Sequence, residues 1–266
     1  MNNKLSYFFV LVFSLGSCVL AAQPLDHQLW DTLLKKHVVV IKNGSVTQVD
    51  YAGFQKDHVL LQRYLDSLAG ITQQDFDAKT ANSQLAILIN LYNAATIELI
   101  LTEYPNLASI KELGSFFRSP WKKTFISAFN KNLSLDEVEH DLIRGSGRYN
   151  DPRIHFAVNC ASIGCPALRA EAYTAEKLQA QLDEQTRLFL ADNTRNRLSG
   201  DELQVSSIFK WYQEDFEKGW NGIDALEAFF VRYSNAIHLA KSDVEKLKRG
   251  DISIAYLEYD WRLNKK

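Results

Sequence analysis

The chain has 266 residues, of which 46% are hydrophobic and 12% aromatic, and this composition is ample for a packed core. Its 30 Lys and Arg residues nearly balance 32 Asp and Glu residues, giving a formal net charge of −2. Such a balance lacks the basic surface that binds nucleic acid, so nucleic acid is not an expected partner. No internal repeat, low-complexity tract or long linker interrupts residues 23–266, which we expect to form a single domain.

The first 22 residues have the pattern of a secretory signal peptide. Lys4 precedes an apolar run over residues 5–15, and the small residues Ala21 and Ala22 follow it. Signal peptidases recognise this order of features, so we expect cleavage near Ala22 and a location in the periplasm or outside the cell. Lipidation of Cys18 is the alternative, because the residues that end at Cys18 resemble a lipoprotein box. Membrane attachment is expected only through this segment or that lipid.

The first elements of the mature chain are a hairpin and a helix. Residues 37–41 and 46–51 are rich in β-branched side chains and flank the pair Asn43-Gly44. Asn-Gly between two such runs is a strong hairpin signal. Residues 54–68 then place leucines at helical spacing, which predicts a helix.

Residues 85–101 form the most apolar segment and are apolar nearly all round, so we expect a central helix that buries Leu88 and Leu91. Three polar residues recur at a spacing of three and form a stripe on this helix: Asn90, Asn93 and Thr96. A stripe of this kind either bonds to neighbouring backbone in the core or faces a substrate. We favour the core network, since buried amides usually serve packing.

Residues 134–137 (SLDE) are a capping box, so a helix begins there and ends near Gly145. Leu135 lies on its core face, and Glu139 lies beside that face, where we expect it half buried and paired. His140 is about 140° away from Leu135 at regular helical spacing. We therefore expect His140 to face water or another element.

The later elements are read from periodicity and turn residues. Asp151-Pro152 either caps a helix or precedes a strand, because residues 154–158 also alternate. The remaining predicted elements are helices over 173–190 (capped by Thr174), 207–216 and 223–233, and a strand over 252–256. The expected fold class is α+β, predominantly helical with a small antiparallel sheet formed by the hairpin and the C-terminal strand.

Four stretches resemble one known family. They are 86–97 (AILINLYNAATI), 134–144 (SLDEVEHDLIR), 151–168 (DPRIHFAVNCASIGCPAL) and 259–264 (YDWRLN), and 207–216 (SIFKWYQEDF) adds support. Their order and spacing resemble the domain of unknown function 547 over roughly residues 30–264. Leu88 departs from that family, which commonly has an aromatic residue there. The family has no established reaction, so the resemblance implies an architecture and no catalytic residue.

Chemistry concentrates around Cys160 and Cys165, which lie among the turn-forming residues of segment 159–166. In the first interpretation Cys160 is a nucleophile that a histidine activates. His140 is the favoured histidine, because the five-residue offset of His155 puts it on the opposite face of a strand, or about 140° away on a helix. Three residues are candidates to orient the imidazole: Asn159, Asp260 and Glu139.

Two structural interpretations compete with the nucleophile. Cys160 and Cys165 can form a disulfide, which the oxidising compartment of an exported protein favours. Alternatively the two cysteines bind zinc together with His140 and His155, since two Cys and two His make a complete tetrahedral set.

The favoured function is a thiol-dependent hydrolase or acyl transferase centred on Cys160, acting on a small molecule or peptide that the sequence does not identify. No cofactor is expected for this chemistry, and no metal. The alternative is a non-catalytic binding or scaffolding domain in which Cys160 and Cys165 form a structural disulfide or zinc site.

Overall fold

A computed structural model of the protein describes residues 26–115 and 118–266. The predicted signal segment, with Lys4, Ala22 and Cys18, lies outside these residues. The first helices are α1 (Gln28–His37), α2 (Tyr51–Lys56), α3 (His58–Ala69), α4 (Gln73–Asp77) and α5 (Ala81–Leu101). The later helices are α6 (Leu178–Leu190), α7 (Ile208–Trp211), α8 (Gln213–Phe216), α9 (Leu226–Arg232) and α10 (Lys241–Arg249).

The predicted N-terminal hairpin is confirmed. Strand β1 (Val38–Ile41) pairs antiparallel with β2 (Val46–Val49), and Val38 lies opposite Val49. The turn between them is a short 3-10 helix (Lys42–Gly44) in which Asn43 has a left-handed φ of 55°. Asparagine tolerates this conformation better than most residues, which explains the Asn-Gly pair.

The helix predicted over residues 54–68 is instead two helices, α2 and α3, with Asp57 between them. The Asp57 carboxylate accepts hydrogen bonds from Lys36 (2.6 Å) and from His37 (2.7 Å), both at the end of α1. The break therefore fixes α1 against the α2–α3 pair, a tertiary contact that helical periodicity does not report.

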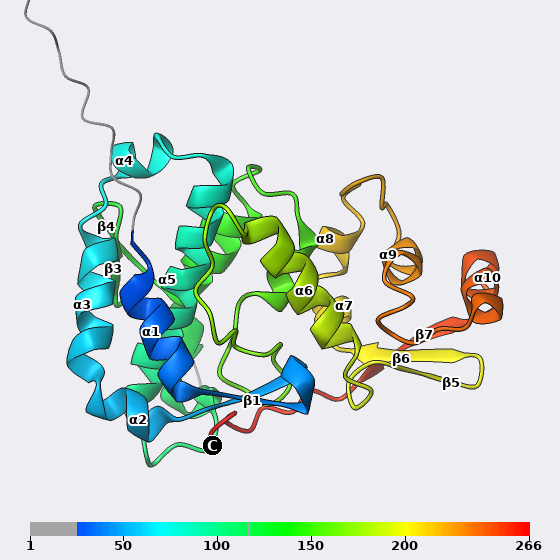
Figure 1. The fold of residues 1–266 in the computed structure, drawn as a ribbon, viewed down its shortest axis with the longest axis horizontal. Coiled ribbons are helices and arrows are strands. Elements are labelled where there is room, and N and C mark those ends of the chain that lie inside the picture. The colour runs from blue at the N-terminus through cyan, green and yellow to red at the C-terminus, as the bar shows by residue number, and fades with distance from the viewer. Residues whose placement is uncertain (1–25, 116–117) are drawn as a thin grey trace, which may run out of the picture.

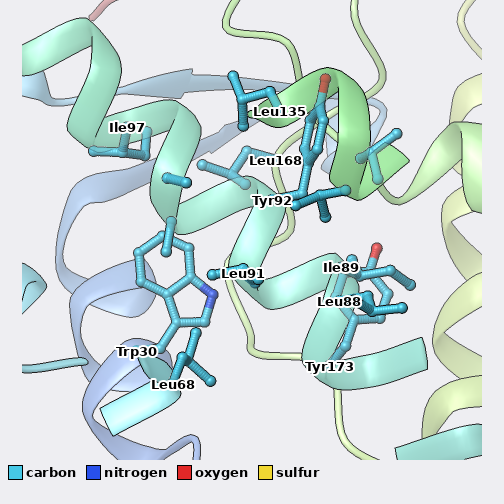
Figure 2. Close-up of a cluster of buried hydrophobic side chains, with 14 of the residues drawn as sticks. Trp30, Leu68, Leu88, Ile89, Leu91, Tyr92, Ile97, Leu135, Leu168 and Tyr173 are labelled. Atoms are coloured by element: carbon cyan, nitrogen blue, oxygen red, sulfur yellow. The ribbon is translucent and has the colours of Figure 1, made fainter. Parts of the chain in front are cut away.

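The central helix is confirmed as α5, whose first turn is capped by the Thr80 hydroxyl. Leu88 and Leu91 are fully buried, as predicted. Although α5 is long and apolar enough to cross a membrane, 89% of its most apolar window is buried inside the protein. Figure 2 shows that its side chains point to several sides of the helix. Leu91 points toward Trp30 and Leu68, whereas Tyr92 points toward Leu135.

The polar stripe of α5 is a core network, as favoured from the sequence. Asn90 exchanges two hydrogen bonds with the backbone of Tyr173, at 2.8 and 3.0 Å. Asn93 donates to the Ala157 carbonyl (2.9 Å) and accepts from the Asn159 amide (2.8 Å). The stripe thus anchors the backbone immediately before Cys160 to the central helix.

In the described residues the strands form three small sheets, and the α+β, predominantly helical fold class is confirmed. The other strands are β3 (Ile126–Ala128), β4 (Lys131–Leu133), β5 (Arg197–Ser199), β6 (Glu202–Ser206) and β7 (Ser253–Leu257). The predicted C-terminal strand exists as β7, but it pairs parallel with β6 and not with the hairpin. The chain reaches the hairpin only after β7, where Lys265 bridges Val49. Periodicity locates a strand but does not select its partner.

The structure corrects the helices predicted over residues 173–190 and 207–216. Helix α6 begins at Leu178, and Thr174 does not cap it; the Thr174 amide instead binds the Gln181 side chain (3.1 Å). The helix expected over 207–216 is two short helices, α7 and α8, which turn at Tyr212. That turn directs the Tyr212 and Asp215 side chains to the site described below.

Across residues 26–115 and 118–266, the buried side chains form two hydrophobic clusters. The first surrounds α5 and includes α1 and α3, and the second is rich in aromatic rings such as Phe156, Phe209 and Phe229. In Figure 1, α1, α3 and α5 lie at one end of the molecule, α9, α10 and β5–β7 lie at the other, and α6–α8 lie between them. Segment 152–168 runs between the two clusters and carries both cysteines.

Candidate functional site

A cavity of about 240 Å³ lies where the two clusters meet. Tyr92 of the first cluster and Ile208 of the second both line it. It brings together five residues that the sequence analysis singled out: Glu139, His140, His155, Cys160 and Cys165. Aromatic side chains complete its wall, namely Trp121, Trp211, Tyr212, Tyr259 and Trp261.

Cys160 and Cys165 are joined in a disulfide with an S–S distance of 2.09 Å. Cys165 is buried, whereas Cys160 is partly exposed in the cavity. The Tyr259 hydroxyl lies 3.1 Å from each sulfur. Burial raises the pKa of Tyr259, so this hydroxyl stays protonated and donates to the Cys165 sulfur.

The loop that carries the disulfide is held from inside. The Asn159 side-chain amide donates to the Pro166 carbonyl (2.7 Å), and its oxygen accepts from the Ala161 backbone amide (3.0 Å). Arg195 also donates to the Cys165 carbonyl. Asn159, expected as a group that orients an imidazole, therefore binds the backbone of its own loop.

Asp260 lies apart from the histidines. Its carboxylate pairs with Arg262 at 2.5 Å, and it does not line this cavity. Its backbone carbonyl accepts from the Gly164 amide (2.8 Å). Asp260 thus supports the disulfide loop through its backbone and offers no carboxylate to an imidazole.

His155 is held by Asp215, a residue that the sequence analysis did not select. Its Nε2 lies 2.7 Å from the Asp215 carboxylate, and its ring stacks on Tyr212 with centroids 4.0 Å apart. No described residue bonds its buried Nδ1. Burial lowers the pKa of His155, so the imidazole is neutral near pH 7. The only available signal for Asp215 was its place in the stretch 207–216.

Asp215 is a strongly stabilised carboxylate. Burial alone would raise its pKa, but hydrogen bonds from His155, Arg144 and Lys218 outweigh burial and hold the pKa well below its usual range. Asp215 therefore stays ionised and fixes the orientation of the His155 ring.

The spacing argument that separated His155 from Cys160 does not hold. Residues Pro152–Phe156 form a 3-10 helix, which Asp151 caps by accepting from the Arg153 amide (3.0 Å). The helical alternative for Asp151-Pro152 is therefore confirmed and the strand is not. The chain leaves this helix after Phe156 and becomes irregular, so no single periodicity relates the two residues, and both line the cavity.

His140 occupies a different position at the same cavity. Its Nδ1 accepts a hydrogen bond from Arg144 (2.8 Å), and its Nε2 lies 3.6 Å from Asp136. Arg144 also donates to Asp215, so one guanidinium links His140 to the carboxylate that holds His155. His140 is about one-third exposed.

The helix that carries Glu139 and His140 is wider than an α-helix. The capping box is confirmed, since the Ser134 amide and hydroxyl both donate to Glu137 (2.7 Å). Residues Glu137–Arg144 then form a π-helix that closes with a bond from the Gly145 amide to the His140 carbonyl (2.7 Å). Such wide turns are rare in proteins, and those that occur often lie at functional sites. The angles expected from a regular α-helix do not apply here.

Residues 76–190 match the family described as "Protein of unknown function, DUF547". This part of the chain is similar to the DUF547 family. The resemblance predicted from the quoted stretches is thereby confirmed over these residues. No curated protein and no solved structure matches the chain significantly.

The DUF547 match covers only part of the cavity. It includes α5, the π-helix, the 3-10 helix before the disulfide, and both cysteines. Tyr212, Asp215 and Tyr259 follow it in the chain. The group that holds His155 and the hydroxyl that contacts the sulfurs thus come from outside the matched DUF547 residues.

The structure does not support the zinc interpretation in the described residues. The described residues contain no group of three or more His, Cys, Asp or Glu side chains placed to hold a metal ion. The two sulfurs are bonded to each other in this structure.

Proposed function

We propose that this cavity is the active site of a thiol-dependent hydrolase or acyl transferase, with Cys160 as the nucleophile and His155 as its base. The observation that supports it is the buried Asp215–His155 pair at the cavity that Cys160 lines. A nucleophile, a base and a third group that orients the base are the parts that thiol and serine hydrolases share. The geometry favours His155 over His140, because Asp215 binds His155 directly.

The protonation states suit this assignment. A general base must be unprotonated at working pH, and burial keeps the His155 imidazole neutral there. Asp215 stays ionised and stabilises the imidazolium that forms when His155 takes a proton.

The disulfide must open before Cys160 can act. A dithiol reductant would supply two electrons and two protons, which convert Cys160 and Cys165 to two thiols. His155 then takes the Cys160 proton while the sulfur attacks a carbonyl carbon, and the same proton passes to the leaving group. The resulting thioester is released by water in a hydrolase or by another nucleophile in a transferase.

A non-catalytic binding domain is the second candidate, and the Cys160–Cys165 bond itself favours it. In that case the disulfide only shapes the wall of the cavity. The two candidates differ in whether a freed Cys160 is unusually reactive.

We expect that freed Cys160 reacts rapidly with iodoacetamide and that His155 causes this. Cys165→Ser frees Cys160 without a reductant and provides the background for further variants. The rate constant at pH 7 should fall by at least about tenfold on adding His155→Ala, because less thiolate is then available. Adding His140→Ala is the matched control and should change it by less than about threefold.

Rate constants are followed by mass spectrometry of the modified mature protein. Cys160→Ser, which leaves only the buried Cys165, should react slowly. An alkylation rate no faster than that of free cysteine, unaffected by His155→Ala, would leave the binding domain as the better description.

We also propose that the protein is exported, on the basis of Lys4 and the apolar run that follows it. The expected result is a mature N-terminus near Gln23, measured by mass spectrometry of the protein from envelope fractions. A retained Met1 would exclude cleavage, and a diacylglyceryl mass on Cys18 would instead identify a lipoprotein.

A further inference from the structure

The carboxylates are the charged groups on the described wall of the cavity. The described residues that line it include two carboxylates, Asp136 and Glu139, and neither Lys nor Arg. His155 does not offset this charge, because burial lowers its pKa and keeps it neutral. The cavity therefore favours a cationic over an anionic ligand group.

Glu139 is the deeper of the two carboxylates, with 5% of its surface exposed. Its carboxylate accepts from the Tyr212 hydroxyl at 2.8 Å, and it forms no ion pair with a described residue. Burial and the Glu139 charge raise the pKa of both Tyr212 and Tyr92, so these neighbouring hydroxyls are neutral. Buried carboxylates are normally paired with a cation, and this one has only neutral donors.

Aromatic rings form the apolar part of the cavity wall. Tyr259 packs against Trp211 with ring centroids 4.8 Å apart and against Trp261 at 4.5 Å. Trp211 is 46% exposed, which is high for tryptophan and leaves ring surface free for a ligand. The Lys111 ammonium lies 3.8 Å from the centre of the Trp261 ring, so this cluster already accepts one ammonium group.

We propose that the cavity binds a primary ammonium group of the substrate, with Glu139 as its counter-charge. The aromatic cluster of Trp211, Tyr259 and Trp261 contacts the aliphatic chain that carries the ammonium. A primary ammonium fits better than a quaternary one, because a carboxylate has about four acceptor positions and the Tyr212 hydroxyl fills one of them. The inference rests on the proposed function in placing the substrate in the Cys160 cavity, but binding itself requires neither reduction nor His155.

The volume limits the size of the bound group. At about 240 Å³ the cavity accommodates a single side chain or small amine and not a folded partner. The inferred substrate class is therefore a small amine, or a peptide that inserts one amino-terminated side chain.

The test compares two probes of equal length on the oxidised protein: n-pentylamine, which is charged at pH 7.5, and 1-pentanol, which is neutral. Tryptophan fluorescence and calorimetric titration give the two dissociation constants. We expect pentylamine to bind at least about tenfold more tightly than pentanol, as a charge-assisted contact with a buried carboxylate should. Glu139→Gln keeps an acceptor for Tyr212 and removes the charge, so it should reduce this preference to within about twofold.

The matched control is Asp136→Asn, which removes the more exposed carboxylate of the same cavity and should retain most of the preference. Trp211→Ala should weaken both probes by a similar factor. Equal binding of the two probes to the wild type would overturn the inference, and so would a preference that survives Glu139→Gln. If that variant does not fold, the wild-type comparison and Trp211→Ala still decide. An inert Cys160 in a protein that prefers pentylamine would instead overturn only the thiol chemistry.

Discussion

Asp215→Asn is expected to lower the free energy of unfolding by about 3 kcal/mol at pH 7, because it removes one partner from a buried, multiply bonded ion pair. Three donors now share this carboxylate: His155, Arg144 and Lys218. The variant leaves Arg144 facing an amide. The same change should slow alkylation of freed Cys160, since the His155 ring loses the charge that stabilises its protonated form.

The effect has a defined pH dependence. The pKa of Asp215 is held below its usual value in the folded protein, so its contribution is complete above about pH 4, the ordinary carboxyl pKa. Below about pH 4 the unfolded chain takes up a proton that the folded protein does not, and the contribution is lost. The stability gap between wild type and Asp215→Asn should therefore narrow at pH 3.

Urea unfolding, followed by tryptophan fluorescence at both pH values, measures this gap. Asp201→Asn is the control, because the Asp201–Lys246 pair (2.8 Å) is exposed and such pairs contribute little to stability. Equal losses in the two variants would show that Asp215 is not the buried anchor of His155.

Leu91→Ala is expected to lower the free energy of unfolding by about 2–5 kcal/mol, the range for large-to-small changes in a core. Leu91 is fully buried on α5 and faces α3, where Leu65 and Ala69 lie beside it. Figure 2 places it on the Trp30 and Leu68 side of the helix, away from Tyr92, which lines the cavity. The loss should therefore appear in stability and leave alkylation of Cys160 in the folded protein unchanged.

Val59→Ala provides the comparison for Leu91. Val59 lies on α3 and is largely exposed, so its truncation should change stability by less than about 0.5 kcal/mol. Chemical unfolding of the two variants under one condition gives both values. An unfolding midpoint of Leu91→Ala that matches the wild type would contradict the central placement of α5.

Local patterns predicted the elements whose residues interact with their own neighbours in the chain. The Asn43-Gly44 turn and the capping box at Ser134 depend on contacts within a few residues, and each was found where the pattern placed it. For Asp151-Pro152 the pattern left a helix cap and a strand open, and the structure has the cap. Helix α5 was predictable for a related reason: a long segment that is apolar nearly all round can only be buried.

The expectations that were wrong depended on partners distant in sequence. Asp57 breaks a helix because it binds the end of α1. Strand β7 pairs with β6, although nothing in its own alternation distinguishes that partner from the hairpin. The helix break at Asp57 and the pairing of β7 are therefore set by tertiary contacts and not by the preferences of the local sequence.

The sequence by itself singled out Cys160, Cys165, Glu139 and the two histidines as candidates. The cysteines lie among turn-forming residues, and Glu139 and His140 lie on the helix that begins at the capping box. Only the tertiary structure brought Asp215 to His155, across 60 residues, and Tyr259 to the Cys160 sulfur, across 99. It also joined the two cysteines and widened the helix of Glu139 and His140 into a π-helix. The packing of the two hydrophobic clusters around the cavity sets the orientation, burial and charge pairing of these side chains. Sequence periodicity describes one helix or strand at a time, so it carries no information about the distance between segments that are remote in the chain.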